Sequence, residues 1–567
     1  MTDFNMDLKT DLQNQSLQTF CLKCIASNFD RFFTLFYTTA NERFRTIFLL
    51  LQKVYGVHLL KMVSEEFNLR DEHLKFLVNK YSHNLNLVYL FNCDSSAIEE
   101  RLLEVGSTVK SFEMPGIKKF NCDHFLKHLS KVQVLQLANT IFSDNSMAII
   151  TKNCHELKSL DVYQCSRVSD KGLEILCQAP PPLENLNIEH TSVTYRGVAL
   201  VLKKIPSLTK LFFDNVPRAI LEATGLNETS GISNYIVFNL NNLVILNNPM
   251  RPENHLTTLL NVCTISCPNV QNLIVSEIIT EEQLDLISTF ENLIIVSLQC
   301  STIVNPKLYI NSFLQIRGSK LTSLSLTSFS LSVKLLASCC PNLESLGLQY
   351  PSFEDTEDIN LACMDLGFPR LKVFNLQNAS LEMNESQISF IISSSPNLEE
   401  LHMVYCFFSD EMREIILQYP KKLTLLNLNN TIVSADFIEE IIRVHNDLER
   451  LELRNSGISS TEYDDLLDMV DEMEKKVNIS WADYTEAIRE LYRLDDSAFN
   501  TMQKRNYCSR TSFWYCLETA ELNCTHKKEV FFVCQCPFIC PDKSIALTAV
   551  KFFTVPIVTQ STILKFF

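Results

Sequence analysis

One nine-residue pattern recurs through most of this chain and constrains its fold more than any other feature. The pattern is L-x-x-L-x-L-x-x-(N/C/small), and its clearest copy is LKSLDVYQC, which begins at Leu157 and ends at Cys165. Fifteen copies between residues 85 and 448 give a period of about 26 residues, which is typical of leucine-rich repeats. The copies begin at Leu85, Val109, Val132, Leu157, Leu183, Leu208, Leu243, Val270, Leu293, Leu321, Leu343, Leu371, Leu398, Leu423 and Leu448.

The spacing within each copy predicts a short strand followed by a helical return. The alternating leucines of x-L-x-L-x point to one face of a strand, and the residues between them point to the other. Ser169 or Asp170 in RVSDKGLEILCQ can cap the following helix, and Ser459 and Glu462 have the spacing of a capping box. A single unit cannot bury its apolar face, so stacked units are needed. The sequence therefore predicts an α/β leucine-rich-repeat solenoid with a concave parallel sheet and helices outside.

The composition narrows the class of function. The net charge of −16 argues against a nucleic-acid partner, because such proteins present a basic stripe to phosphates. The N-terminus lacks the apolar stretch of a secretory signal, so we expect a cytosolic or nuclear protein whose 20 cysteines are mostly buried and reduced. With 11 glycines and no phosphate-binding loop or H-E-x-x-H motif, we expect no cofactor, no metal and no enzymatic activity.

Two dissimilar ends flank the repeats. We predict a helical cap module at 1–80, the solenoid at 81–480, and a C-terminal helix with a cysteine-rich, poorly ordered tail at 481–567. A zinc site in this tail is an alternative, because six cysteines lie within 33 residues, but only Cys536 and Cys540 have a suitable spacing. A membrane anchor formed by the last 24 residues is a second alternative, although Lys551, Pro556 and other polar residues interrupt the apolar run, and we expect no membrane partner.

The segment SLQTFCLKCI, at residues 16–25, carries the most specific functional signal. Leu17, Cys21 and Ile25 recur every four residues, which places them along one face of a helix that Ser16 can cap. One interpretation is that this stripe packs on a neighbouring helix, with Phe29 and Phe32 extending it. The other is that the stripe docks into a groove of a partner protein.

The pattern of SLQTFCLKCI resembles the BC box of elongin-dependent ubiquitin-ligase receptors. Its position before cysteine-type repeats is similar to the arrangement in the Zyg/Zer receptor family. The cysteine type rests on Cys93, Cys165 and Cys406 at the ninth position and on Cys154, Cys267 and Cys340 before the first leucine. The resemblance implies that Leu17 is the anchor on elongin C, with Cys21 and Ile25 as further contacts, and that elongin B and a cullin are partners.

The sequence also departs from this family. The family's cullin-selecting segment contains a proline, whereas ANERFRTIFLLLQKV has the apolar spacing without one. The armadillo-like repeats of Zyg/Zer proteins have no counterpart in the roughly 110 residues after the last copy, so the family's substrates are not carried over. Similar Leu/Cys spacings at Leu173–Cys177 and at Leu335, Cys339 and Leu343 lie inside the repeats, where they fit the core.

The residues between the strand leucines form the surface on which we expect a protein substrate to bind. Exposed aromatic residues and arginines dominate protein interfaces. The resemblance implies a non-catalytic substrate receptor. The alternatives are a repeat scaffold or enzyme regulator with no ligase link, an F-box receptor, which is weaker because the N-terminal segment has no Leu-Pro opening, and an ordinary solvated face. The predicted substrate-binding residues are Asp161, Tyr163, Asn187, Phe212, His402, Arg450 and Arg454.

Overall fold

The computed structural model describes most of the chain as two compact units. The described residues are 17–65, 70–87, 95–116, 122–225, 236–245, 254–300, 308–354, 367–378, 385–406 and 409–481, with two short strands at 521–522 and 532–533. Unit 1 comprises Met1–Lys372 and Ser386–Ser395, and unit 2 comprises Val373–Glu385 and Pro396–Phe567. The cysteine cluster and the apolar end of the tail, for which zinc and membrane alternatives were considered, lie outside the described residues.

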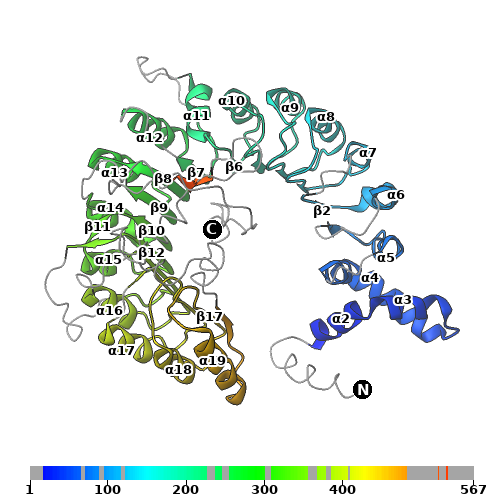
Figure 1. Ribbon diagram of the computed structural model, residues 1–567. Coiled ribbons are helices and arrows are strands. Elements are labelled where there is room, and N and C mark those ends of the chain that lie inside the picture. The colour runs from blue at the N-terminus through cyan, green and yellow to red at the C-terminus, as the bar shows by residue number, and fades with distance from the viewer. Residues whose placement is uncertain are drawn as a thin grey trace. The chain divides into compact units, whose positions relative to one another are not determined.

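Unit 1 contains two series of parallel strands with helices packed along their outer side (Figure 1). The first series is β1 (Asn84–Asn86), β2 (Ser111–Glu113), β3 (Val134–Gln136), β4 (Ser159–Asp161), β5 (Asn185–Asn187) and β6 (Lys210–Phe212). The second is β7 (Asn242–Ile245), β8 (Asn272–Ile278), β9 (Ile295–Cys300), β10 (Ser323–Thr327) and β12 (Ser345–Gln349), with a small parallel pair of β11 (Ser330–Leu331) and β13 (Ser352–Phe353).

The helices of unit 1 begin with four that precede the repeats. These are α2 (Leu17–Ser27), α3 (Phe29–Thr38), α4 (Glu42–Glu65) and α5 (Asp71–Leu77). The helices that return between strands are α6 (Ser95–Val105), α7 (Asp123–Leu126), α8 (Asp144–Asn153), α9 (Asp170–Leu176), α10 (Tyr195–Lys204), α11 (Val216–Thr224), α12 (Asn254–Ser266), α13 (Glu281–Ile287), α14 (Asn311–Arg317), α15 (Val333–Cys339) and α16 (Glu385–Ser393), with 3₁₀ turns at Gly106–Thr108 and Gly318–Lys320.

Unit 2 continues the same repeat. Its parallel strands are β14 (Val373–Gln377), β15 (Glu400–Val404), β16 (Leu425–Asn427), β17 (Arg450–Glu452) and β18 (Asn478–Ser480), and its helices are α17 (Asp410–Gln418), α18 (Ala435–Val444) and α19 (Ser460–Glu472). The strands β19 (Glu521–Leu522) and β20 (Phe532–Val533) form an antiparallel pair.

The registers of the strands confirm the repeat. Leu160 lies opposite Leu135 on one side and Leu186 on the other, so the leucines at the fourth position stack from strand to strand. All three are at most 1% exposed. Burying one leucine side chain contributes about 1.5–3 kcal/mol, and the stack repeats this gain in every unit. The predicted leucine-rich-repeat solenoid is therefore the fold of the chain.

Two of the fifteen starting points were wrong by three residues. Leu85 lies opposite Phe112, and Leu243 lies opposite Leu273, which makes both leucines fourth-position residues. The first buried residues of these copies are Ser82 and Leu240. In both segments, apolar residues recur at spacings of three and two residues. Each segment therefore fits the template from either of two starting points, three residues apart. The assignment of Cys93 to a ninth position was wrong for the same reason.

Strand β18 adds one repeat that the template does not detect. Ile479 pairs with Leu451 of β17, so Lys476 and Trp481 occupy positions where other copies carry apolar aliphatic residues. The Trp481 indole Nε1 donates a hydrogen bond to the Ile458 carbonyl at 3.0 Å, and its ring stacks on Tyr463 with centroids 4.9 Å apart. An aromatic side chain therefore packs beside the last of the parallel strands that the structure describes.

The predicted helix caps are present and are linked from one repeat to the next. Ser169 caps α9, and Ser459 and Glu462 form the capping box of α19. At the start of α9, the Asp170 carboxylate accepts hydrogen bonds from the Thr194 backbone N at 2.7 Å and the Thr194 hydroxyl at 2.6 Å. Gly197 allows this approach, because a Cβ there would collide with the carboxylate.

Replacing Asp170 by alanine is expected to lower the free energy of unfolding by about 1–3 kcal/mol, because two hydrogen bonds between adjacent repeats are lost. Urea denaturation of the full chain checks this value. The matched control is Asp285→Ala on α13, whose side chain is exposed, and it should change stability by less than about 0.5 kcal/mol. Equal effects of the two substitutions would contradict the structural role of Asp170.

Buried cysteines are part of the repeat core, as predicted. Cys154, Cys267 and Cys340 are at most 1% exposed, and the described cysteines form no disulfide. Burial raises the pKa of the Cys154 thiol to about 12, so this thiol stays protonated at neutral pH. Cys165 Sγ donates to the Leu137 carbonyl at 3.2 Å, which explains why a small donor suits the ninth position.

A buried histidine makes unit 2 sensitive to acid. His445 is 3% exposed and its Nε2 lies 3.1 Å from the Ile416 carbonyl. Burial lowers the pKa of His445 below its ordinary value of 6.5. The unfolded chain therefore takes up a proton before the folded chain does, so the contribution of His445 to stability is complete above about pH 6.5 and is lost as the pH falls toward its folded pKa.

Wild-type unit 2 is expected to lose up to about 1.4 kcal/mol of stability per pH unit below pH 6.5 through this residue. In His445→Gln, an amide can still donate to the Ile416 carbonyl but does not titrate. Urea denaturation between pH 5 and 7.5 should show a steeper loss for the wild type than for the variant. Parallel curves for the two proteins would contradict this role.

Helices α3, α4 and α5 are held together by aromatic rings. Phe29 of α3 is 1% exposed, and its ring lies 6.0 Å from Phe48 of α4 and 5.1 Å from His73 of α5, measured between centroids. His73 Nε2 lies 2.9 Å from Asp30 Oδ1, and Arg70 donates to Asp30 Oδ2 at 2.6 Å. Helix α3 is thereby held against α4 and α5.

Helix α4 is also long and apolar enough to cross a membrane over Glu42–Val63, by length and composition only. Core helices pass the same test, so this is weak evidence for a span. Its buried side chains, such as Phe48, Leu59 and Val63, pack within the protein.

Candidate protein-docking surfaces

Helix α2 carries the three residues predicted to bind elongin C. Its inner side is defined by Leu22, which is 5% exposed, and Ala26, which is 1% exposed. Cys21 is exposed and Ile25 is half-buried, so the predicted stripe does not lie in the core at Cys21. Leu17 is the first residue of α2, and its side chain lies outside the described part of the structure. The stripe passes from exposed Cys21 to the fully buried Phe29, which belongs to the next helix.

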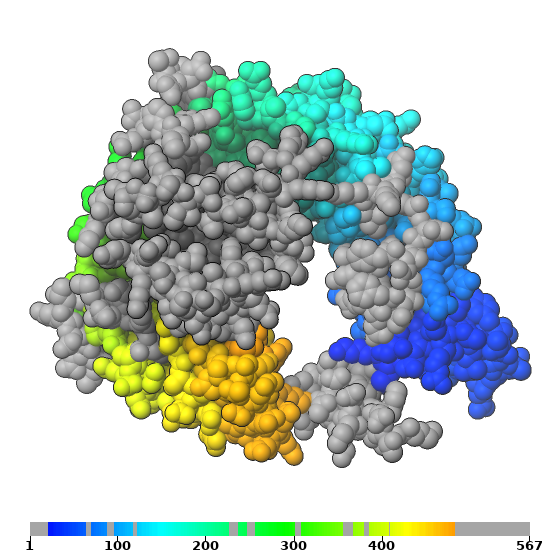
Figure 2. Space-filling view, viewed as in Figure 1, coloured from blue at the N-terminus to red at the C-terminus, as the bar shows by residue number. Residues whose placement is uncertain are grey.

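Helix α4 presents a second exposed apolar surface. Ile47, Leu50 and Val54 are 58%, 55% and 62% exposed and are spaced i, i+3 and i+7, which places them on one side of the helix. We refer to these three residues as the α4 stripe. No acidic residue occurs between Glu42 and Glu65 in the sequence, whereas Arg43 and Lys61 fall on the same side as the stripe. In Figure 2 the N-terminal helices form the dark blue surface of unit 1.

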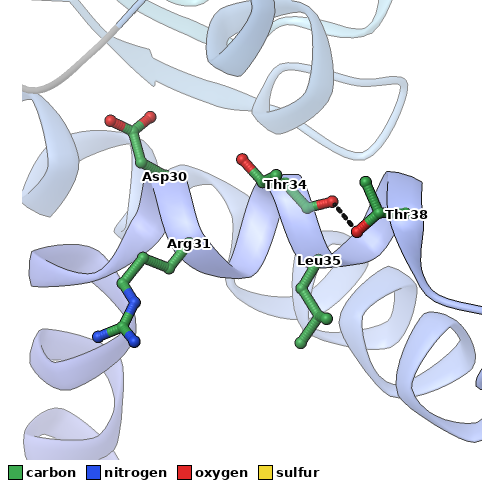
Figure 3. Close-up of a pocket in the computed structure, with 5 residues that line it drawn as sticks. All are labelled: Asp30, Arg31, Thr34, Leu35 and Thr38. Atoms are coloured by element: carbon green, nitrogen blue, oxygen red, sulfur yellow. Dashed lines mark hydrogen bonds between the residues drawn. The ribbon is translucent and has the colours of Figure 1, made fainter.

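A shallow hollow of about 360 Å³ runs along α3. Figure 3 shows Asp30, Thr34 and Thr38 on one side of the helix and Arg31 and Leu35 on the other. The Thr38 hydroxyl donates to the Thr34 carbonyl at 2.9 Å. The hollow is part of the exposed surface of the N-terminal helices.

Four of the predicted substrate-binding residues come together on unit 1. Asp161, Asn187 and Phe212 lie side by side at matching positions of β4, β5 and β6, and Tyr163 follows two residues after Asp161. The Tyr163 backbone N donates to Asp161 Oδ1 at 2.9 Å. Burial raises the pKa of Asp161 despite hydrogen bonds from the Tyr163 backbone and the Asn187 side chain. All four residues are half-buried on the strand side of the unit.

The sequence analysis missed His190 on this surface. His190 follows β5 in a left-handed turn with φ 56°, and its ring packs edge-on against Tyr163 with centroids 5.2 Å apart. Its Nδ1 lies 4.0 Å from the Asp214 carboxylate. The eighth position of other repeats adopts the same turn, with residues as varied as Asn139 and Tyr350, so the residue type gives no signal.

The other three predicted residues lie on unit 2. His402 is half-buried between Glu400, at 3.5 Å from Nε2, and the Asn427 amide, at 3.3 Å from Nδ1. The hydrogen bond from His402 lowers the pKa of Glu400. Arg450 and Arg454 are exposed, and Arg454 Nη2 lies 3.5 Å from the Ser480 hydroxyl. Each unit thus carries its own group of candidate residues.

These groups do not form a metal site. Within the described ranges, no cluster of three or more His, Cys, Asp and Glu side chains has a geometry that could hold a metal ion. The surfaces offer carboxylates, amides, aromatic rings and guanidinium groups, which are groups that recognise protein chains.

Comparison with protein-family models gives no match for this chain. No curated protein matches it either. Among solved structures, it is similar to a chain in the crystal structure of the Rad7 and Elc1 complex in yeast, with 14% identity and a TM-score of 0.36 over 77% of this chain and 93% of that chain. It is also similar to a chain in the TLR13–ssRNA13 complex, with 14% identity and a TM-score of 0.35 over 70% of this chain.

The chain spans 63% of that second chain, which is less than two thirds of its length. Both TM-scores lie below 0.5, so neither similarity supports a statement about function. The stacked strands and buried leucines identify the architecture directly. By its own repeats, the protein is a leucine-rich-repeat solenoid, and the described residues before its first strand form the helices α2–α5.

Proposed function

We propose that this protein is the non-catalytic substrate-recognition subunit of an elongin–cullin–RING ubiquitin ligase. Helix α2 docks on elongin C through Leu17, Cys21 and Ile25, and the repeats bind a protein substrate. The proposal includes a cytosolic or nuclear location and no nucleic-acid or membrane partner. The ligase complex raises the effective concentration of ubiquitin-conjugating enzyme near the substrate, so the receptor needs no catalytic group.

The observation that carries the proposal is the exposure of Cys21 on a helix whose opposite side is buried. A helix that docks into a groove needs one side free and the other side supported. Leu22 and Ala26 supply the support, and Cys21 with half-buried Ile25 supplies part of the free side. Leu17 lies four residues before Cys21, so helical geometry favours the same side.

The α4 stripe supports a second docking contact. Monomeric proteins rarely expose several large apolar side chains together unless the surface binds a partner. Residues 40–54 lie where the resembling receptors carry their cullin-selecting segment, and the α4 stripe supplies three of the four exposed large apolar residues there, the fourth being Leu49. We propose that the cullin contacts this stripe.

Co-purification with elongins B and C tests the proposal. The wild-type chain should retain both elongins, and Leu17→Asp combined with Cys21→Asp should lose them, because two charges would enter an apolar groove. The matched control is Lys23→Asp combined with Ser27→Asp, which adds carboxylates at exposed positions of the same helix. Failure of the wild type to bind, or binding by the Leu17/Cys21 variant, would overturn the proposal.

A repeat scaffold with no ligase link is the second candidate. The interface-type residues on the strand sides of both units favour it as much as they favour a receptor. A wild-type chain that captures a protein through these surfaces but binds neither elongin would support the scaffold.

A further inference from the structure

The strand side of β4–β6 in unit 1 carries an unusual concentration of acidic and aromatic side chains. Asp161, Glu189 and Asp214 come from three neighbouring repeats, and Tyr163 and Phe212 lie among them. We call these five residues the acidic–aromatic face. The helices α9–α11 lie on the outer side of the same strands (Figure 1). The acidic–aromatic face is on the opposite side, so these three helices do not cover it.

The outward positions of the strands in unit 1 differ in charge. Farther along unit 1, the equivalent outward positions of β9, β10 and β12 hold small or uncharged side chains. These positions are Ser297, Gln299, Ser325, Thr327, Gly347 and Gln349. The repeat fold therefore forms without acidic side chains at these positions, so the carboxylates on β4–β6 are not required for folding.

Two of the three carboxylates of the face, Asp161 and Glu189, are partly buried, whereas Asp214 is exposed. Burial raises the pKa of Asp161, and burial together with the charge of Asp214 raises the pKa of Glu189. Part of the cost of removing these groups from water is therefore already met in the free protein, and an arriving cation would gain Coulomb energy in a region of reduced dielectric constant. His190 Nδ1 lies 4.0 Å from the Asp214 carboxylate, and exposed Lys210 lies two residues before Phe212 on β6.

The aromatic rings add a second recognition element for the same kind of ligand. Tyr163 and Phe212 are half-buried at the positions that flank Asn187 and Glu189. Lysine and arginine side chains pack their alkyl stems on such rings and place their charges over ring faces or beside carboxylates. An anionic ligand such as a phosphate backbone would be repelled by the three carboxylates.

We propose that the acidic–aromatic face binds a cationic, lysine- or arginine-containing segment of a partner protein. This inference rests on the proposed function in that it names the substrate class of the receptor, and it locates recognition on β4–β6 of unit 1. The carboxylates of Asp161, Glu189 and Asp214 engage the cationic groups, and Tyr163 and Phe212 contact the side-chain stems and neighbouring apolar residues.

Fluorescence anisotropy with the intact chain and a labelled peptide, GKFGRKFGR, tests this inference. The wild type should bind this probe, and the charge-neutral probe GQFGQQFGQ should bind at least about tenfold more weakly. The variant Asp161→Asn, Glu189→Gln, Asp214→Asn keeps the hydrogen-bond acceptors and removes the charge, and it should bind the cationic probe at least about tenfold more weakly than the wild type. Tyr163→Ser with Phe212→Ser should weaken binding of both probes.

The matched control removes the same charge from the helices. Glu174→Gln, Glu222→Gln, Asp285→Asn changes three exposed residues of α9, α11 and α13 and should bind the cationic probe like the wild type. Equal weakening of the two triple variants would identify non-specific attraction to an acidic protein and overturn the inference, as would tight binding by the Asp161/Glu189/Asp214 variant or no binding by the wild type. The assay contains no elongin, so its failure and the failure of the ligase proposal are separate results.

Discussion

Replacing Phe29 by alanine is expected to destabilise the N-terminal helices by about 3–5 kcal/mol, the usual cost of a large aromatic cavity. Phe29 is 1% exposed and its ring lies against Phe33, Phe48 and His73. Its removal therefore leaves a cavity among these three rings. Hydrogen exchange of peptides from α2–α5 in the intact chain measures the free energy of local opening. Elongin binding should weaken as well, because α2 loses its support.

Tyr37 supplies the matched control in the same helix. It is 60% exposed and its ring contacts only the edge of the cluster at Phe33 and Phe36, so Tyr37→Ala should change the opening free energy by about 1 kcal/mol or less. If the two alanine substitutions had equal effects on hydrogen exchange, the aromatic cluster would not be what holds α3 between α4 and α5.

The second large effect is expected at the α4 stripe. Leu50→Asp should weaken binding of the cullin to the receptor–elongin complex at least about tenfold, because it places a carboxylate in the middle of an apolar contact. Folding should be unaffected, since Leu50 is already 55% exposed. Binding is measured by surface plasmon resonance with the elongin-bound receptor immobilised.

Leu49→Asp is the control for this variant. Leu49 is 46% exposed on α4, but it lies about 100° around the helix from Leu50 and away from the stripe, so the same substitution there should leave cullin binding within about twofold of the wild type. Equal loss in both variants would indicate a general charge effect, and unchanged binding by Leu50→Asp would remove the stripe from the docking surface.

The repeat architecture could be predicted because each repeat imposes the same burial pattern. Leu135, Leu160 and Leu186 stack in register, so their spacing in the sequence maps directly onto the core. The template failed where its physical basis was ambiguous. Leu85 and Leu243 are each followed by apolar residues that fit a shifted register, and the last strand uses Lys476 and Trp481 in place of leucines.

The candidate sites were predictable only in part. Parallel strands bring Asp161, Asn187 and Phe212 together once their repeats are aligned, so that adjacency follows from the sequence. Exposure does not follow from it. Leu17, Cys21 and Ile25 have the same spacing whether the stripe packs inside or faces a partner, and the apolar residues of α4 divide into buried Phe48 and exposed Leu50 only through the packing of α2–α5.

Hydrogen exchange of residues 17–27 with and without elongins B and C tests the central claim most directly. If α2 docks on elongin C, the backbone amides of this helix should exchange at least about tenfold more slowly in the complex, while strands β4–β6 should be unchanged. Unchanged exchange across α2 at saturating elongin, or protection confined to the repeats, would contradict the account of α2 as the docking helix.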